Sequence, residues 1–314
     1  MTEYVYGNTP CFLNGSKLNK AEDAKGVQAA VYGVPWEGGV TWGDYTGCEL
    51  APKAMRIASG RYSGYLPEID HLDVFEHLNI GDFGDVDINP NDSEDTMNRI
   101  ISFTKDKLWS QSVFPIALGG DHSITYPIVK ALSETRDQTI GLIHLDAHYD
   151  NMPEHEEDKY ARNTPFARLY EFEGVRNESL IHAGIRGPRN KPESGRYARD
   201  AGAVTITLKE MRETRDLYKM AADIYEKASD GVDAVYLSIC SDVLDYAFNP
   251  GGPPDANGLT SFELLTLIHE FGKRGLAGMD FVEVYPNQEN QLFSAHLASN
   301  IVLYTLAGHV LGAH

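Results

Sequence analysis

Residues 139–150 read TIGLIHLDAHYD, an apolar run that ends in acidic and imidazole side chains. The apolar half is continuous rather than alternating, which is typical of a strand buried on both faces of a parallel sheet. The polar half begins where the apolar residues stop. In open parallel sheets, ligands bind beyond the carboxyl ends of the strands. We therefore expect a buried strand here that carries a polar site at its end.

Seven other apolar runs share this character, and most are separated by segments with helical spacing. The eight runs lie at residues 27–36, 77–86, 113–122, 139–150, 179–187, 203–208, 234–245 and 276–286. Helical patterns occupy residues 93–111, 207–231 and 260–275. The first opens at Ser93 with acids in its first turn, and the second ends at Gly231. This alternation predicts a parallel sheet covered on both faces by helices.

The composition limits the class of protein. The chain has 314 residues, of which 42% are hydrophobic, and this is ample for a large core. Its net charge of -19 argues against nucleic acid or an anionic membrane as a partner. Acidity suits a cationic substrate, although solubility is the commoner reason for it.

Neither a targeting segment nor a disulfide framework is expected. The N-terminus has no basic start followed by an apolar stretch, unlike a signal peptide. No uncharged apolar run approaches the ~20 residues of a membrane span. Three cysteines, Cys11, Cys48 and Cys240, are too few and too scattered for a disulfide framework. We therefore expect a cytoplasmic protein in which Cys11 and Cys48 are inert structural thiols.

Four of the runs end in acids, imidazoles or a thiol. In chain order these residues are Asp121 and His122, then Asp146, His148 and Asp150, then Cys240, Asp242 and Asp245, and finally Asp280 and Glu283. Because the carboxyl ends of parallel strands meet at one edge of a sheet, we expect these side chains to gather at a single rim.

The spacing of Asp146, His148 and Asp150 predicts a metal site. Alternate residues of an extended chain point the same way, so these side chains can converge and Asp146 can share its oxygens between two cations. Imidazole with carboxylate suits Zn, Mn, Fe, Co or Ni better than Ca or Mg, and two such ions can activate water. The alternative is that these groups are loop caps or hydrogen-bonded core groups. We interpret His144, within the apolar part of the run, as a core histidine with satisfied hydrogen bonds.

Five segments resemble, in order, the signature segments of the ureohydrolase family of arginases, agmatinases and guanidinases. They read ALGGDHS, HLDAHYD, AGIRG, YLSICSDVLD and GMDFVEVYP, and the stretch GVPWEGGVTWGDYTGCELAPKAMR resembles the family's opening. The resemblance covers nearly the whole chain and implies one domain over residues 1–314. It implies a three-layer α/β/α fold around a mostly parallel eight-stranded sheet, and assembly as trimers or hexamers. It also implies hydrolysis of a guanidino C–N bond with two Mn ions, or Ni in the guanidinase branch.

The same resemblance assigns roles to individual residues. Two metal sites would share one carboxylate and consist of His122, Asp146 and Asp150 on one side and Asp146, His148 and Asp242 on the other. Glu283 would bind the cationic guanidinium of the substrate by charge-assisted hydrogen bonds. Asn163 would be a second substrate contact.

Two positions depart from the family's pattern. Cys240 stands where the family has a second Asp that bridges the metals, and Arg162, in YARNTPF, stands where relatives often carry a proton-relaying His. One sulfur cannot reproduce the two-oxygen bridge of a carboxylate, and thiolate suits Ni or Zn better than Mn. Arg162 is always protonated, so it can be neither a base nor a useful acid near neutral pH. His155 is a candidate replacement for the relay, but we interpret it as a solvated residue of a charged run.

These departures favour a degenerate subunit that is weakly active or non-catalytic and carries one metal ion or none. It would complete a hetero-oligomer with a catalytic paralogue, as in metformin hydrolase, whose branch the stretches VTWGDYTGCEL and DAHYDNMPE resemble. One alternative is an active Ni- or Mn-dependent hydrolase of the guanidinase or agmatinase kind, with Cys240 as a thiolate ligand. Another is a nucleophilic Cys240, which would need a nearby base and an orienting acid.

Overall fold

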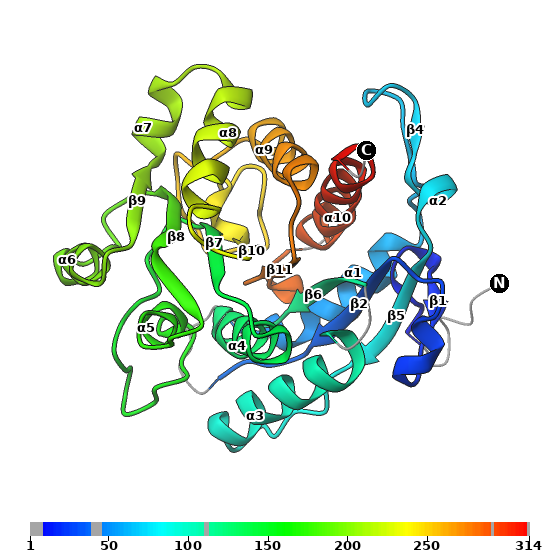
Figure 1. Ribbon diagram of the computed structural model, residues 1–314, viewed down its shortest axis with the longest axis horizontal. Helices are drawn as coiled ribbons and strands as arrows, with labels where there is room; N and C mark the ends of the chain where they lie inside the picture. The colour runs from blue at the N-terminus through cyan, green and yellow to red at the C-terminus, as the bar shows by residue number, and fades with distance from the viewer. Residues whose placement is uncertain (1–8, 39–45, 110–112, 290–291, 313–314) are drawn as a thin grey trace.

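A parallel sheet forms the centre of the molecule (Figure 1). The computed structural model describes residues 9–38, 46–109, 113–289 and 292–312. Within these ranges the sheet has nine strands in the order β1-β5-β2-β6-β11-β10-β7-β8-β9, and every neighbouring pair runs parallel. The bounds are β1 (Ser16–Lys17), β2 (Ala29–Val34), β5 (Ile80–Asp85), β6 (Phe114–Gly119), β7 (Ile140–Leu145), β8 (Val175–Ile185), β9 (Val204–Thr207), β10 (Ala234–Cys240) and β11 (Gly278–Val282).

Each of the eight predicted apolar runs supplies one strand of this sheet. The strand missing from the prediction is β1, which has two residues and pairs with β5 at the sheet edge. Its exposed Ser-Lys pair has no apolar pattern, so the sequence predicts eight strands where the structure has nine. A separate antiparallel pair, β3 (Tyr65–Leu66) with β4 (Leu72–Asp73), lies apart from the sheet (Figure 1).

Helices cover both faces of the sheet, which confirms the predicted three-layer α/β/α architecture. Neighbouring strand residues face opposite layers, as Val31 and Tyr32 of β2 do. One layer contains α1 (Ala51–Ser59), α2 (Val74–His77), α7 (Leu208–Glu213), α8 (Leu217–Ala228), α9 (Ser261–Arg274) and α10 (Phe293–Gly312). The other contains α3 (Ser93–Thr104), α4 (Thr125–Arg136), α5 (Pro165–Tyr170) and α6 (Pro192–Ala201).

Local signals set the ends of α9 as predicted. The Thr260 hydroxyl accepts a hydrogen bond from the Glu263 backbone N–H, and the Glu263 carboxylate accepts one from the Thr260 N–H. This reciprocal pair satisfies two backbone donors at the start of the helix. At the other end, Gly275 has a φ of 96°, a left-handed value that glycine adopts without strain.

The predicted helical segment 207–231 is wrong in one respect, because it is divided into α7 and α8. Asp216 begins a new helix: its carboxylate accepts hydrogen bonds from the N–H groups of Tyr218 and Lys219. Before it, Arg215 has a left-handed φ of 56°. The side-chain cap therefore overrides the helical spacing at this point.

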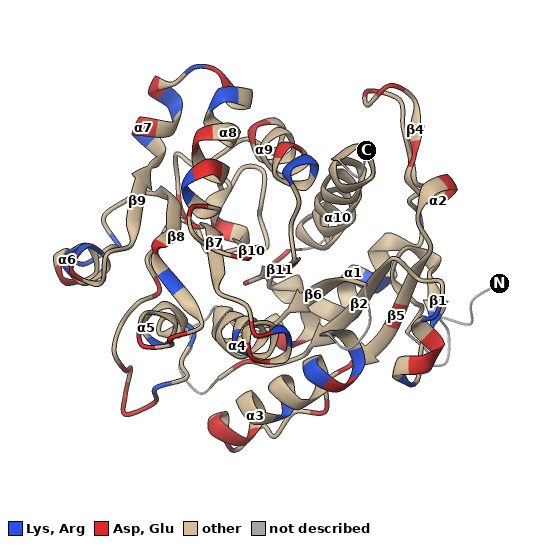
Figure 2. Cartoon of the chain, viewed as in Figure 1, with Lys and Arg blue, Asp and Glu red and all other residues tan. Residues whose placement is uncertain are grey.

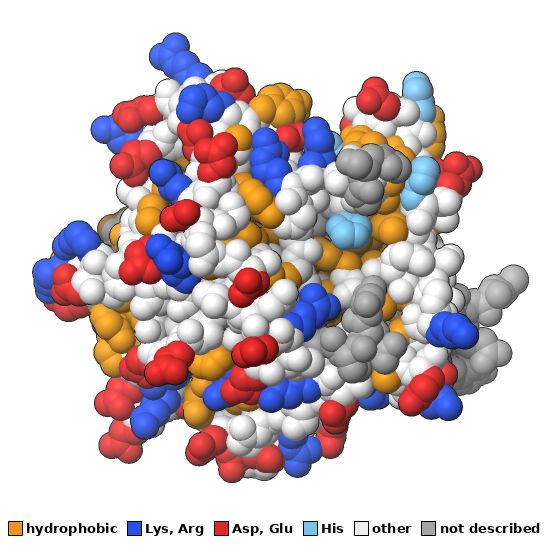
Figure 3. Space-filling model, viewed as in Figure 1, with side chains coloured by type: hydrophobic (Ala, Val, Ile, Leu, Met, Phe, Trp, Pro, Cys, Tyr) orange, Lys and Arg blue, Asp and Glu red, His pale blue; other side chains and the backbone are white. Residues whose placement is uncertain are grey.

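Charged residues lie mainly on helices and loops, whereas the central strands are mostly uncharged (Figure 2). On the face shown in Figure 3, acidic and basic side chains are interspersed. None of the helices in the described ranges is long and apolar enough to cross a membrane.

A buried ion pair joins the first helix to the sheet. The guanidinium of Arg56 in α1 contacts Asp82 of β5 through two bonds, with Nε 2.8 Å from Oδ2 and Nη2 3.0 Å from Oδ1. Both side chains are nearly inaccessible, at 3% and 2% exposure. Asp82 also accepts a hydrogen bond from the Phe12 N–H at 2.8 Å, so it ties three segments together.

We predict that Arg56→Met strongly destabilises the fold. It removes the cation and leaves the Asp82 carboxylate buried without its charge partner, which typically costs about 3–5 kcal/mol. Urea unfolding followed by circular dichroism measures the change. The matched control is Arg99→Met, because Arg99 pairs with Asp95 at the surface and its loss should change the unfolding midpoint little. Equal midpoints for the two variants would contradict the prediction.

Candidate metal centre and adjoining cavity

The predicted polar residues lie at the carboxyl ends of four neighbouring strands. These strands are β6, β11, β10 and β7, which are adjacent in the sheet order. His122 follows β6, Asp146 follows β7, Cys240 ends β10 and Glu283 follows β11. The order of the strands thus brings together residues that are up to 161 positions apart in the chain.

Five of the predicted residues form a compact group that we call the candidate metal centre: His122, Asp146, His148, Asp150 and Asp242. On one side, His122 Nδ1 lies 3.1 Å from Asp146 Oδ2 and 2.9 Å from Asp150 Oδ2. On the other side, His148 Nδ1 lies 3.0 Å from Asp242 Oδ2 and 3.5 Å from Asp146 Oδ1. Asp146 therefore turns one oxygen toward each imidazole, an arrangement that suits a carboxylate shared by two cations.

Hydrogen bonds behind the candidate metal centre hold the first imidazole in place. Ser238 Oγ lies 3.0 Å from His122 Nε2 and donates to Asp280 Oδ1 at 2.8 Å. This contact directs the opposite nitrogen, Nδ1, toward the carboxylates. Such outer hydrogen bonds commonly orient metal-binding histidines.

His144 behaves as predicted for a core histidine with satisfied hydrogen bonds. It is fully buried, with Nε2 2.9 Å from Asp146 Oδ2 and Nδ1 2.7 Å from His182 Nδ1. Its ring stacks on Phe166 with a centroid separation of 3.8 Å. The burial predicted for this residue is confirmed, and its contact with Asp146 makes it a support of the candidate metal centre.

Cys240 lies beside the candidate metal centre, where it offers a thiol instead of the carboxylate that the family has at this position. A ligand atom of Asp146, one of Asp242 and the Cys240 sulfur all lie within 4.8 Å of one another. Burial raises the pKa of Cys240 well above its usual value, and the carboxylates of Asp146 and Asp242 raise it further. Without a cation the thiol therefore stays protonated. These surroundings also argue against Cys240 as a nucleophile, because acids oppose formation of the thiolate.

The donor set fits at least one divalent transition-metal ion. Each side of the candidate metal centre offers one imidazole and two carboxylates, with Asp146 counted on both sides. Such ligands suit Mn, Fe, Co, Ni or Zn. Two dications would bring four positive charges to three carboxylates, whereas an Asp at position 240 would balance them. The residues present should therefore bind a first divalent ion more tightly than a second one.

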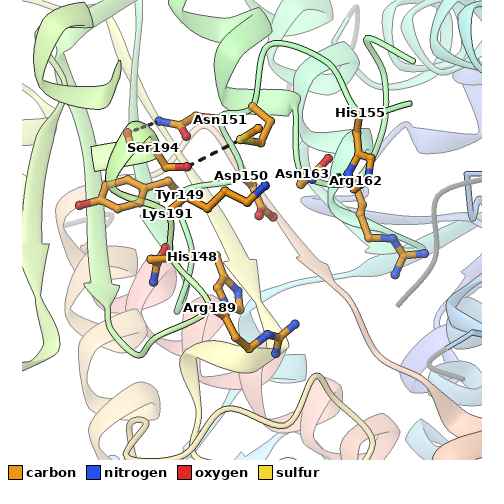
Figure 4. Close-up of a pocket in the computed structure, with 12 residues that line it drawn as sticks. His148, Tyr149, Asp150, Asn151, His155, Arg162, Asn163, Arg189, Lys191 and Ser194 are labelled. Carbon is orange, nitrogen blue, oxygen red and sulfur yellow. Dashed lines mark hydrogen bonds between the residues drawn. The ribbon is translucent and has the colours of Figure 1, made fainter. Parts of the chain in front are cut away.

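A cavity of about 320 Å³ opens beside the candidate metal centre (Figure 4). Its walls include His148, Tyr149, Asp150, Asn151, Met152, His155, Arg162, Asn163, Arg189, Asn190, Lys191 and Ser194. Asn163 lines this cavity, where a substrate contact would lie, and its Nδ2 is 2.6 Å from His155 Nδ1. His155 is thus half-buried in the wall, which differs from the solvated position we expected.

Arg162 lies between this cavity and Glu283. Its Nη1 is 3.3 Å from Glu283 Oε2 and also donates to the Tyr285 hydroxyl, while its Nη2 is 2.8 Å from Glu37 Oε1. Burial alone would lower the pKa of Arg162, but Glu283 and other nearby groups raise it, so the guanidinium stays charged. The predicted substrate-binding acid is therefore already paired with a cation from its own chain.

Two acids at this rim have left-handed backbones. Asp150 has a φ of 43° and Glu283 a φ of 63°. Such values cost about 1–3 kcal/mol for residues other than glycine and cluster at functional sites. The surrounding structure therefore holds these two carboxylates in place against a local preference.

Besides Glu283, three acids predicted at the rim lie outside the candidate metal centre: Asp245, Asp121 and Asp280. Asp280 lies within β11 and accepts hydrogen bonds from Ser238 and Thr125. Asp245 accepts hydrogen bonds from the N–H groups of Ala247 and Gly258, so it caps a loop. Asp121 accepts from the N–H groups of Ser123 and Gly38. Asp245 and Asp121 therefore act as loop caps rather than as members of the candidate metal centre.

Three residues near the site were missed by reasoning from the sequence. Glu37 follows β2, and a single acid after an apolar run is only a weak signal for a functional site. Tyr285 lies two positions after Glu283, a spacing that places both side chains on one side of an extended segment. Asp255 has its Oδ2 3.5 Å from His148 Nε2 and 2.5 Å from Arg189 Nη1. Asp255 comes from an irregular loop, so no pattern indicates it.

Known proteins resemble the chain over most of its length. The Arginase family matches residues 27–308. A guanidinopropionase from Pseudomonas aeruginosa is 32% identical over 287 residues, which cover 90% of this chain and 85% of the relative. The structure of a proclavaminate amidino hydrolase from Streptomyces clavuligerus has a TM-score of 0.85 and 29% identity, and covers 98% of this chain and 99% of its own. A Trypanosoma cruzi formiminoglutamase solved with Mn²⁺ shares the fold, with a TM-score of 0.84 and 22% identity over 96% of this chain and 99% of its own.

We predict that affinity for a divalent ion rises with pH. Burial would lower the pKa of His122 and of His148, but the adjacent carboxylates raise both well above the usual value. The metal-free imidazoles therefore hold their protons to higher pH than a free imidazole does, and they must lose these protons when an ion binds. Below these pKa values, each released proton should raise the apparent affinity about tenfold per pH unit. Titration calorimetry of Mn²⁺ into the chelator-treated chain at about pH 6 and about pH 8 measures this change.

The control cation is Ca²⁺, which this imidazole-containing set should bind weakly. Buffers of different ionisation enthalpy report the number of protons released. An Mn²⁺ affinity that stays level or falls as the pH rises would contradict the prediction.

Proposed function

Because the chain belongs to the arginase family, we propose that it is a ureohydrolase-type subunit for guanidino compounds that has little or no turnover by itself. The observation that carries this proposal is the thiol of Cys240, which lies against Asp146 and Asp242 where a second bridging carboxylate was expected. The relatives named guanidinopropionase and proclavaminate amidino hydrolase support the guanidino class of substrate.

The metal would be held by the candidate metal centre. His122, Asp146 and Asp150 would bind one ion, and His148 and Asp242 would bind a second, weaker one together with Asp146. When bound, such ions supply Lewis acidity and make water nucleophilic near neutral pH. We propose Mn, in keeping with the formiminoglutamase solved with Mn²⁺, or Ni, which accepts a sulfur ligand more readily.

The chain's own residues would position the substrate. Asp150 and His148 line the cavity, so a ligand there lies directly against the candidate metal centre. Asn163 offers an amide to the same cavity (Figure 4). Arg162 at the position of the relay histidine cannot move a proton near neutral pH. His155, which contacts Asn163, is the imidazole at the cavity wall that could do so instead.

A subunit of this kind would work in an assembly. We propose a homo- or hetero-oligomer, a trimer or hexamer, in which a catalytic paralogue supplies the complete metal site, as in a metformin hydrolase-type heteromer. Part of one stretch that suggests this branch, residues 40–45 of VTWGDYTGCEL, lies outside the described residues. Purification of the chain with and without the paralogue tests this arrangement by light scattering.

The second candidate is an active hydrolase with a remodelled site. The sulfur of Cys240 is close enough to Asp146 and Asp242 to join a metal ion that they bind. A bound cation would lower the pKa of this thiol and convert it to a thiolate ligand. This function would require metal-dependent urea release by an oligomer of this chain alone.

We predict that Cys240→Asp increases the metal content of the chain. The added carboxylate would restore the second bridge and balance the charge of a second ion, so bound metal should rise from at most one ion per chain toward two. Elemental analysis after desalting measures the content. Cys240→Ser is the matched control, because it removes sulfur without adding a carboxylate and should bind no more metal than the native chain.

Turnover separates the two candidate functions. A panel of guanidino compounds should show little urea release by the native chain alone, since losing one proton-transfer group typically costs about 10²–10⁴ in rate. Rapid hydrolysis by the native chain that falls in Cys240→Asp and in Cys240→Ser would reject the degenerate subunit and support the remodelled hydrolase.

A further inference from the structure

We propose that Glu37, Glu283 and Tyr285 form a binding pocket for a guanidinium cation and that Arg162 is its built-in occupant. We call these three residues the guanidinium pocket. The inference rests on the guanidino class of ligand proposed above, and it adds that the chain's own side chain competes with that ligand.

The acceptors of the guanidinium pocket match the donors of one planar cation. Glu37 Oε1 accepts from Nη2 of Arg162 at 2.8 Å, and Glu283 Oε2 accepts from Nη1 at 3.3 Å. The Tyr285 hydroxyl accepts from the same Nη1. Guanidinium presents several N–H donors in a fixed plane, so acceptors arranged around it recognise that shape rather than a point charge.

The surroundings of this cation are buried and acidic. Arg162 and Glu283 are each 3% exposed, and Tyr285 is fully buried. The Arg162 guanidinium carbon lies 5.9 Å from the centre of the Tyr285 ring, within the range of a cation–π contact. Two carboxylates thus contact one cation, whereas a single ion pair needs only one. The left-handed backbone of Glu283 marks the same position as strained.

The guanidinium pocket adjoins the candidate metal centre. The second carboxylate oxygen of Glu283, Oε1, accepts a hydrogen bond from the His122 N–H at 2.9 Å. Arg162 itself lines the cavity that also contacts Asp150. A guanidino compound in the cavity would therefore reach Glu283 only by taking the place of Arg162.

This competition should weaken ligand binding without any loss of the pocket. A tethered group has a high effective concentration at its site. A free guanidinium must displace Arg162 from the guanidinium pocket. The apparent association constant of the ligand therefore equals its intrinsic value multiplied by the fraction of molecules in which Arg162 has left the pocket. Shortening residue 162 should therefore expose a ready-made site.

The test is binding of methylguanidinium to the full-length Arg162→Ala chain after treatment with chelator. The probe should bind this variant at least about tenfold more tightly than the native chain, and it should raise the melting temperature that the substitution lowers. Calorimetry and thermal unfolding measure both effects. Urea, which has a similar shape but no charge, should do neither.

Two controls assign the effect to the guanidinium pocket. Arg99→Ala removes an arginine that pairs with Asp95 at the surface and leaves Arg162 in place, so its affinity for the probe should equal that of the native chain. Glu283→Gln added to Arg162→Ala should abolish the gain. Equal affinity in Arg162→Ala and the native chain, or an equal gain in Arg99→Ala, would overturn the proposal.

A measurement on the native chain covers the case in which Arg162→Ala does not fold. The Nε–H of buried Arg162 should exchange slowly with solvent in nuclear magnetic resonance spectra, and added methylguanidinium should accelerate this exchange selectively. Unchanged protection at the highest probe concentration that leaves the chain folded would overturn the proposal. Neither test involves metal or turnover, so failure here is distinguishable from failure of the proposed function.

Discussion

The central constraint of this structure is the crowding of buried carboxylates at one edge of a parallel sheet. Four adjacent strands, β6, β11, β10 and β7, end at the same edge. Asp146, Asp242 and Glu283 are each nearly inaccessible there. A buried charge is tolerated only when it is paired and hydrogen-bonded. Every cation at this edge, whether imidazolium, guanidinium or metal, therefore has a structural as well as a functional effect.

The two departures from the family pattern act on this charge balance in the same direction. Cys240 removes one negative charge, and Arg162 adds one positive charge in place of a histidine that would be neutral for much of the time. Among the ion pairs at the site, six carboxylates face four potential cations in the metal-free chain: Glu37, Asp146, Asp150, Asp242, Asp255 and Glu283 against His122, His148, Arg162 and Arg189. With Asp and a neutral His at positions 240 and 162, seven carboxylates would face three. The site as it stands therefore has a weaker requirement for two dications than a fully liganded one.

Periodic features were predictable from the sequence, and contacts between distant loops were not. The apolar runs locate all strands of the central sheet but β1, whose two residues carry no pattern, and they do not locate the separate β3–β4 pair. Spacing alone also misses the cap at Asp216 that divides one helical segment. At the site, the rule that ligands lie beyond strand ends brings His122 and Asp146 together. The Arg162–Glu283 pair joins residues 121 positions apart and depends on the path of a loop. The sequence indicates that Arg162 cannot relay a proton, but not which carboxylates it binds.

The contact between Arg162 and Glu283 also links the stability of the folded chain to the access of a ligand to these carboxylates. Without Arg162, the partly desolvated carboxylates of Glu37 and Glu283 would lose the cation they share, and burial then opposes ionisation of both. A substrate guanidinium could satisfy them only while bound, whereas Arg162 satisfies them at all times. The internal cation therefore stabilises the folded chain and at the same time closes the position that a ligand would use. Such a conflict between stability and activity is common where an active site is held in a strained, charged state. In the subunit proposed above, the conflict is resolved in favour of stability.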